Sequence, residues 1–269
     1  MDAVQRRRPP LMDWKLTKSL YILVFLLINI GLIMMYYNKQ QEDIHKIENR
    51  PNILEETNID LSQLPEHEPR KLNILSAVKA TFIDSEEVEA ETVETTNEGY
   101  VLKNDFEAGE NAPDMTREDL ENHKAEEVYR GSEYEYDDVM SDEGYMLFNQ
   151  HYEELPIFNN EAARLLYRGD GQQAMEYEQG YLKNISENEY TSPVAVRDPE
   201  KVVASLYTDE RISGEAEIED ARLGYYIILN DGDQVLLRPK WRLNINDQGV
   251  DKTVYVDAIS ETEDIIERE

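Results

Sequence analysis

Residues 19–37 constrain the chain more than any other stretch, because they read SLYILVFLLINIGLIMMYY and contain no charged residue. Their only strongly polar side chain is that of Asn29. At about 1.5 Å of rise per residue, a helix of this length just crosses the roughly 30 Å of hydrocarbon in a bilayer. A buried helix of a soluble protein keeps a polar stripe, whereas this run is apolar all round. It therefore predicts a transmembrane helix over residues 19–37.

The main alternative is a signal peptide that is cleaved, since basic residues followed by an apolar run introduce one as well. Cleavage needs small residues directly after the apolar run, and residues 34–40 read MMYYNKQ, which are bulky. A lipoprotein signal is excluded because the chain has no cysteine. We therefore expect a membrane anchor that stays in place.

The charges on either side of the run predict its orientation. Residues 1–18 hold five basic and two acidic residues, while the whole chain holds 27 basic and 58 acidic residues. Because positive flanks stay in the cytoplasm, we expect residues 1–18 to be cytoplasmic and the C-terminal part to be extracellular. The sequence thus predicts a single-pass protein of the cell membrane, with the lipid bilayer as one partner.

The predicted external part has no cysteine and is strongly acidic. The lack of disulfides favours the outer face of a bacterium over an oxidising eukaryotic secretory route. The negative charge repels nucleic acid, teichoic acid and anionic lipid, so no nucleic-acid partner is expected. Two interpretations of the acidic surface stay open, a merely solvated surface and one that recruits a basic partner.

The first half of the external part begins with a polar, proline-containing stalk over residues 38–70. Residues 71–82 read as a strand, residues 84–98 as an exposed acidic loop, and residues 99–106 as a strand that pairs with the first. Thr116 and Asp119 then predict a capped helix that Gly131 ends. Residues 132–158 read as a hairpin, with its turn at residues 142–144.

The second half repeats this order more clearly. Residues 162–182 form two runs around Gly169-Asp170-Gly171, which predicts a hairpin. Asp198 and Pro199 start a helix whose apolar face holds Val202, Val203 and Leu206. Three strands follow over residues 221–229, 234–245 and 252–259, and residues 261–269 read as a frayed acidic tail.

The last long strand alternates in a way that predicts a sheet with one solvated face. Trp241, Leu243 and Ile245 point one way, and Lys240, Arg242 and Asn244 point the other. The fold class predicted from these elements is α+β, with two related external lobes at residues 71–155 and 156–260. Each lobe is expected to hold a helix packed on an antiparallel sheet.

The residues that could carry chemistry form no recognisable site. The four histidines (His45, His67, His123 and His151) have no metal-ligand spacing and are read as surface residues. The acids Glu133, Glu135, Asp137 and Asp138 lack the order of a calcium loop and are read as a solvated strand edge. Catalytic motifs are absent from the sequence. We therefore predict no enzyme activity and no catalytic, cofactor-binding or metal site.

The opening MDWKLTKSLYILVFLLINI, from Met12, resembles the start of the YycI (WalI) family of Firmicutes membrane proteins, in which Asp-Trp-Lys-x-Thr-Lys precedes the membrane helix. The stretches EELPIFNN, ARLGYYIIL, LLRPKWRLNI and TVYVDAI resemble the family in the same order, so the resemblance runs from Met12 to Ile259. It implies an external fold of two α+β lobes. It also implies a regulator that, with the related membrane protein YycH, acts on the sensor histidine kinase WalK (YycG) of the WalK–WalR two-component system, which governs cell-wall metabolism.

Other function classes stay open beside this one. They are an extracytoplasmic cell-wall enzyme, an enzyme inhibitor, and a ligand-binding sensor with its cleft between the lobes.

Within the predicted membrane helix, Asn29 is the residue that stands out, because an amide in a bilayer is usually turned toward another helix. At helical spacing it shares a face with Ile22, Phe25, Leu32 and Tyr36. We expect this face to contact a partner helix; the alternative is that Asn29 is simply a tolerated polar residue.

Overall fold

The structure is a computed structural model that describes residues 14–48, 53–83, 93–106, 112–158, 160–260 and 265–268. It divides into two units, residues 1–53 and 54–269, which are described one at a time.

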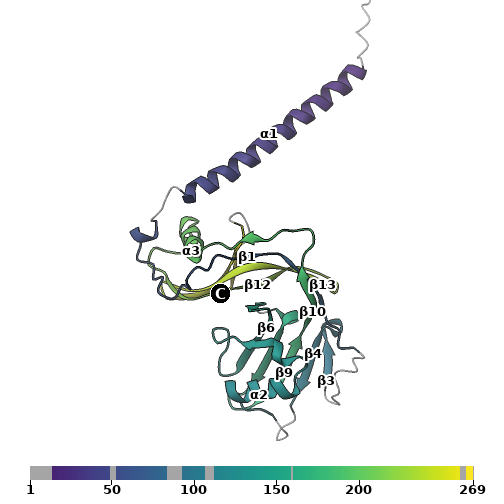
Figure 1. Cartoon of the computed structure of the whole chain (residues 1–269), viewed down its shortest axis with the longest axis vertical. Coiled ribbons are helices and arrows are strands. Elements are labelled where there is room, and N and C mark those ends of the chain that lie inside the picture. The colour runs from purple at the N-terminus through teal and green to yellow at the C-terminus, as the bar shows by residue number, and fades with distance from the viewer. Residues whose placement is uncertain are drawn as a thin grey trace, which may run out of the picture. The chain divides into compact units, whose positions relative to one another are not determined.

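The first unit contains a single long helix, α1, over Trp14–Glu48 (Figure 1). Its stretch Lys18–Met35 is long and apolar enough to cross a membrane, and its side chains are not buried within the structure. This helix fits the predicted anchor over residues 19–37. The helical backbone continues to Glu48, into the segment predicted as the stalk. Most of the predicted cytoplasmic segment lies outside the described residues.

The second unit is built mainly from antiparallel strands, with two further α-helices. Its helices are α2 (Arg117–Glu127) and α3 (Pro199–Thr208), with short 3₁₀ turns η1 (Leu54–Glu56), η2 (Asn97–Gly99), η3 (Gly131–Glu133) and η4 (Glu161–Ala163). Its strands are β1 (Lys71–Leu72), β2 (Leu75–Lys79), β3 (Val93–Thr96), β4 (Val101–Asp105), β5 (Tyr134–Tyr136), β6 (Tyr145–Tyr152), β7 (Leu155–Pro156), β8 (Arg164–Gly169), β9 (Ala174–Gly180), β10 (Leu182–Glu187), β11 (Val194–Ala195), β12 (Glu217–Asp231), β13 (Gln234–Asp247), β14 (Val250–Asp257) and β15 (Ile266–Arg268).

These strands form two large sheets and one small one. The six-stranded sheet has the order β10-β2-β13-β14-β15, with β12 also paired to β13. The seven-stranded sheet has the order β3-β4-β9-β8-β6-β5, with β7 also paired to β6. Strands β1 and β11 form a two-stranded sheet. The mixed α+β class and the antiparallel sheets are therefore as predicted.

Helix α3 packs on the six-stranded sheet through the face that the sequence indicates. The Asp198 side chain accepts from the Glu200 backbone N–H, and Pro199 occupies the first turn. Val202, Val203 and Leu206 are fully buried in a hydrophobic cluster with apolar side chains of β13 and β14. Figure 1 shows α3 on one side of this sheet.

Helix α2 packs on the seven-stranded sheet. The Thr116 hydroxyl accepts from the Asp119 backbone N–H and donates to the Asp119 carboxylate at 2.6 Å, so the predicted cap is present. Leu120 is buried in a second hydrophobic cluster with Phe148 and Leu165 of the sheet. The hairpins predicted at residues 132–158 and 162–182 are the pairs β5–β6 and β8–β9.

The two large sheets are joined by a backbone bridge just after β7 and by the chain itself, which crosses from β2 to β3 and back from β9 to β10. Strand β7 pairs with β6 of the seven-stranded sheet, and Ile157 just after it bridges Tyr225 of β12 in the six-stranded sheet. Tyr181 separates β9 from β10, which belong to different sheets. Strand β2 lies in the sheet of the C-terminal strands, while β8 and β9 lie in the other. The predicted lobes at residues 71–155 and 156–260 stay a prediction, and the strands of the two sheets are interleaved along the sequence.

Three local predictions were wrong. Residues 93–96 of the predicted acidic loop form β3, while residues 84–92 lie outside the described residues. Strand β4 pairs with β3 and β9 rather than with residues 71–82, which are broken into β1 and β2. Residues 266–268 of the predicted frayed tail form β15, which pairs with β14.

Trp241 tests the central strand assignment. Its side chain is only 5% exposed, and its indole N–H donates to the Arg197 carbonyl oxygen at 3.0 Å. We expect Trp241→Ala to lower the free energy of unfolding by ~3–5 kcal/mol, because the large cavity cannot collapse fully. Denaturant titration followed by circular dichroism measures this. Tyr190→Ala, which removes a ring that is 94% exposed, is the control and should change the value by less than ~0.5 kcal/mol. A loss below ~1 kcal/mol in Trp241→Ala would contradict the packing.

His123 places a titratable ring in the aromatic cluster between α2 and the seven-stranded sheet. Its Nδ1 lies 2.8 Å from the Tyr167 hydroxyl, and its ring contacts those of Phe106 and Tyr177 edge to face. Burial lowers the pKa of His123, and the nearby Glu127 only partly opposes this. The predicted surface position of this histidine was therefore wrong, because α2 turns it inward.

A lowered histidine pKa makes stability depend on pH with a definite sign. The unfolded chain binds the proton at about pH 6.5 while the folded protein resists it, so stability is lost as the pH falls through this value. We expect the free energy of unfolding to decrease from about pH 7.5 to about pH 5.5, and His123→Gln to reduce that decrease. The exposed His67→Gln should leave it as in the wild type. Equal pH slopes in wild type and His123→Gln would refute the assignment.

Candidate interaction surfaces

The predicted membrane face lies on α1 as a continuous stripe. Ile22, Phe25, Asn29 and Leu32 lie three or four residues apart on one helix, so their side chains share one side of it. Ile22, Phe25 and Leu32 are exposed within the structure. Tyr36 also belongs to α1, but its side chain lies outside the described residues. That this face contacts a partner stays a prediction.

Asn29 makes one hydrogen bond within its own helix. Its Nδ2 donates to the Phe25 carbonyl oxygen at 2.8 Å, four residues earlier. An amide carries two N–H groups and one carbonyl oxygen, so this bond uses only part of its capacity. The internal bond lowers the cost of an amide in hydrocarbon without satisfying the whole side chain.

A layer of buried polar side chains lies on the face of β13 opposite α3. Arg242 is 1% exposed and Asp137, which follows β5, is fully buried. Arg242 Nη1 forms an ion pair with Asp137 Oδ2, and Nη2 donates to Asp220 of β12 at 3.3 Å. Asn149 of β6 donates to the same Asp137 carboxylate at 2.5 Å. The ion pair therefore joins the six-stranded sheet to the seven-stranded one.

The surroundings of Arg242 favour its charged form. Burial lowers the pKa of Arg242, but the charge of Asp137 and the hydrogen bond to it outweigh this effect, so that the net shift is upward. The guanidinium also stacks over the Phe158 ring, with 5.2 Å to the ring centroid. Because desolvation offsets the attraction, we expect this pair to fix the position of the two sheets more than it stabilises them.

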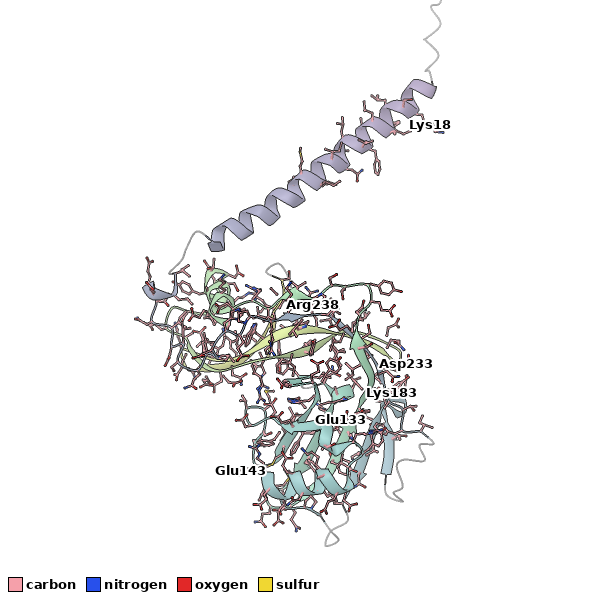
Figure 2. The ribbon with its side chains drawn as sticks, viewed as in Figure 1. Lys18, Glu133, Glu143, Lys183, Asp233 and Arg238 are labelled. Atoms are coloured by element: carbon pink, nitrogen blue, oxygen red, sulfur yellow. The ribbon has the colours of Figure 1, made fainter. Side chains whose placement is uncertain are left out.

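A second carboxylate extends the layer along the same face. Asp257 of β14 is fully buried and forms an ion pair with Arg238 of β13, which Figure 2 labels. The other oxygen of Asp257 accepts the backbone N–H groups of Ile259 at 2.9 Å and Ser260 at 2.7 Å. Lys240, between Arg238 and Arg242, is buried and its ammonium lies over the Tyr226 ring at 5.9 Å.

The prediction that Lys240, Arg242 and Asn244 form a solvated face was therefore wrong, as was the reading of Asp137 as part of a solvated edge. The alternation along β13 was correct, but the polar side is covered by the second sheet. Polar residues at three alternate positions of a strand do not reveal whether that face of the sheet meets water or a carboxylate of another sheet. The available signal was the choice of arginine, which suits buried ion pairs better than lysine does.

Other titratable residues of the described ranges make contacts in pairs. Among the described residues, no group of three or more His, Asp or Glu side chains is arranged to hold a metal ion. His151 is half-buried and its Nε2 lies 3.2 Å from Glu135. Glu133, labelled in Figure 2, accepts a hydrogen bond from the Tyr181 hydroxyl at 2.8 Å. Each of these contacts joins a single pair of side chains.

Comparison with known families identifies the chain. The model of the YycI protein family matches residues 36–259, which is most of the sequence. The chain belongs to the YycI family. This family consists of regulatory proteins associated with the WalK–WalR system, so the resemblance seen at Met12 to Ile259 is confirmed over the matched residues.

Two further comparisons add little. No match was found among the curated proteins. One solved structure that matches the chain is that of an uncharacterized protein from Eubacterium rectale ATCC 33656, with 11% sequence identity and a TM-score of 0.45, covering 77% of this chain and 89% of that one.

The buried pair gives a prediction about stability. We expect Arg242→Met to lower the free energy of unfolding by ~3–5 kcal/mol, because it leaves the Asp137 carboxylate buried without its counter-charge. The double variant Arg242→Met/Asp137→Leu should recover part of this loss, since both charges are then gone.

Arg168→Met is the matched control, because Arg168 forms partly exposed ion pairs with Glu176 and Glu178. Its cost should stay below ~1 kcal/mol. Chemical denaturation of the four proteins under one condition measures all values. Equal losses in Arg242→Met and Arg168→Met would show that the buried pair does not hold the sheets.

Proposed function

We propose that this chain is a membrane-anchored regulator that, together with a YycH-like partner, modulates the sensor histidine kinase WalK of the WalK–WalR system. The observation that carries the proposal is the family match over residues 36–259. In this proposal the N-terminus is cytoplasmic, α1 spans the membrane once, and the unit of residues 54–269 is extracellular. The protein acts by binding and carries out no reaction.

The features of the chain support this orientation and mode of action. One helix near the N-terminus has the length and composition of a membrane span, which fits a single-pass anchor. Basic residues precede it, and the formal net charge of the whole chain is −31. A large acidic unit held by its own apolar clusters and buried ion pairs suits a stable docking body outside the cell.

Asn29 supplies a directional contact for the membrane part of this proposal. Its amide keeps one N–H and a carbonyl oxygen beyond the bond to Phe25, and these groups can pair with a polar side chain on a neighbouring helix. Such bonds contribute about 0.6 kcal/mol on average in a membrane, so they orient helices more than they hold them.

The test replaces Asn29 by leucine in the full-length chain. Asn29→Leu keeps the span apolar, so the amount of protein in the membrane should be unchanged. We expect less WalK and YycH-like protein to co-purify with it, and expression of WalR-controlled genes to shift. Asn29→Gln should retain both properties. Asn29→Leu/Leu27→Asn should not restore them, because it moves the amide to the opposite side of the helix at unchanged composition.

Two results would count against parts of the proposal. If Asn29→Leu and a chimera with a foreign membrane helix both signal normally, the membrane route is wrong and the external unit makes the contact. If the wild-type chain co-purifies with neither protein and its deletion leaves WalR-controlled genes unchanged, the regulatory function itself is wrong.

A further inference from the structure

Strand β12 is an edge strand, and two other segments of the chain form backbone bridges with its outer side. Its inner side pairs with β13 along the whole strand. On its outer side, Asp60 bridges Glu217 and Ile157 bridges Tyr225, both in the parallel direction. Extended backbone therefore already pairs with this edge at Glu217 and at Tyr225.

The hydrogen bonds at these places are those of strand addition. The Asp60 N–H donates to the Ala216 carbonyl oxygen at 3.1 Å, and the Ile218 N–H donates to the Asp60 carbonyl oxygen at 3.1 Å. Further along, the Phe158 N–H donates to the Tyr225 carbonyl oxygen at 2.8 Å. Backbone bonds of this kind are the means by which sheet edges bind extended peptides.

Beyond Tyr225 the same edge has no third segment among the residues that the structure describes. Ile228 is 44% exposed and Leu229 is 51% exposed. A register shift between Ile227 and Leu229 leaves Ile228 without a partner on β13. Residues 223–229 read LGYYIIL and contain no charge or proline. Charged residues and proline, which often protect exposed edges, are missing from this stretch, and the bulge at Ile228 is its one irregularity, so Ile228 and Leu229 lie open to an added strand.

The charges beside the edge indicate which occupant fits it. Asp231 ends β12, and Asp233 follows in the turn to β13, where Figure 2 labels it. A second copy of the chain would bring a formal net charge of −31 against the same charge. A partner segment that is apolar and ends in a basic residue complements the side chains of Ile228 and Leu229 and the carboxylates of Asp231 and Asp233.

We propose that the outer edge of β12 from Ile227 to Asp231 docks an extended segment of the partner protein. The segment adds in parallel, as Ile157 does, with apolar side chains on Ile228 and Leu229 and a basic residue beside Asp231. This inference rests on the proposed function, because it assigns the contact through which the external unit meets its partner.

The first experiment places a photo-crosslinking amino acid at Leu229 of the full-length chain, in cells that express WalK and the YycH-like protein. The control position is Val250, which is 58% exposed at the start of β14 in the same sheet. We expect Leu229 to give about tenfold more product than Val250 with one of the two proteins, as for a residue at the centre of an interface. Mass spectrometry should map the product to a short apolar segment that ends in lysine or arginine.

The second experiment compares Ile228→Lys/Leu229→Lys with Val250→Lys. Lysine on an edge strand opposes strand addition and repels a basic segment. Co-purification of the partner should fall about tenfold in the edge variant and less than about twofold in the control. Because the crosslink is made on a single altered residue, it stays informative if the double variant does not fold.

The outcomes separate this inference from the proposed function. If the partner co-purifies with the edge variant as with the wild type, or if Leu229 gives no more product than Val250, the edge is not the docking site and the regulatory function stands. A product with the mass of two copies would show that the occupant is a second chain, which overturns the proposal. If the wild type co-purifies with neither protein, the proposed function fails. Whether Leu229 forms more crosslinked product than Val250 then tests docking at the β12 edge by itself.

Discussion

The ion pair between Arg242 and Asp137 is the contact on which the arrangement of the second unit depends. It lies between two sheets whose other faces are already covered by α3 and α2, so the inner faces must match each other. A purely apolar pairing of two curved sheets would tolerate sliding. A carboxylate that accepts from Arg242 and Asn149 at once fixes one position, because each displacement leaves a buried charge without its partner.

Local structure was largely predictable from the sequence, and the way the elements assemble was not. The caps at Thr116 and Asp198 and the hairpin turns were read correctly because they depend on neighbouring residues only. Strand partners of β4 and the burial of Arg242 depend on residues far along the chain, and a periodic pattern carries no information about them. The candidate site shows the same limit. Asn29 was visible because polar residues are rare in a membrane span, whereas the β12 edge is apolar like the core strands beside it, and only the sheet order reveals that one side lies open.

The proposed regulator thus has two regions through which it can act, and they differ in physical character. Because apolar surface drives no association between helices in a membrane, the proposal assigns the orienting contact of the span to the amide of Asn29. At the β12 edge, the proposed docking relies on backbone hydrogen bonds and on burial of the exposed side chains of Ile228 and Leu229. A partner that contacts both regions binds more tightly than one that contacts a single region, because the first contact raises the effective concentration for the second.

The length of helix α1 has a mechanical consequence for the proposed regulator. Its backbone does not stop at Met35, where the candidate membrane span ends, but remains helical to Glu48. An unbroken helix is a stiff rod, so a turn of the span about its own axis carries the residues beyond the apolar run through the same angle. At about 1.5 Å per residue, that extension reaches roughly 20 Å past Met35. If α1 spans the membrane as proposed, a rotation imposed on it by a neighbouring helix would reach residues beyond the lipid, whereas a flexible linker would not transmit it.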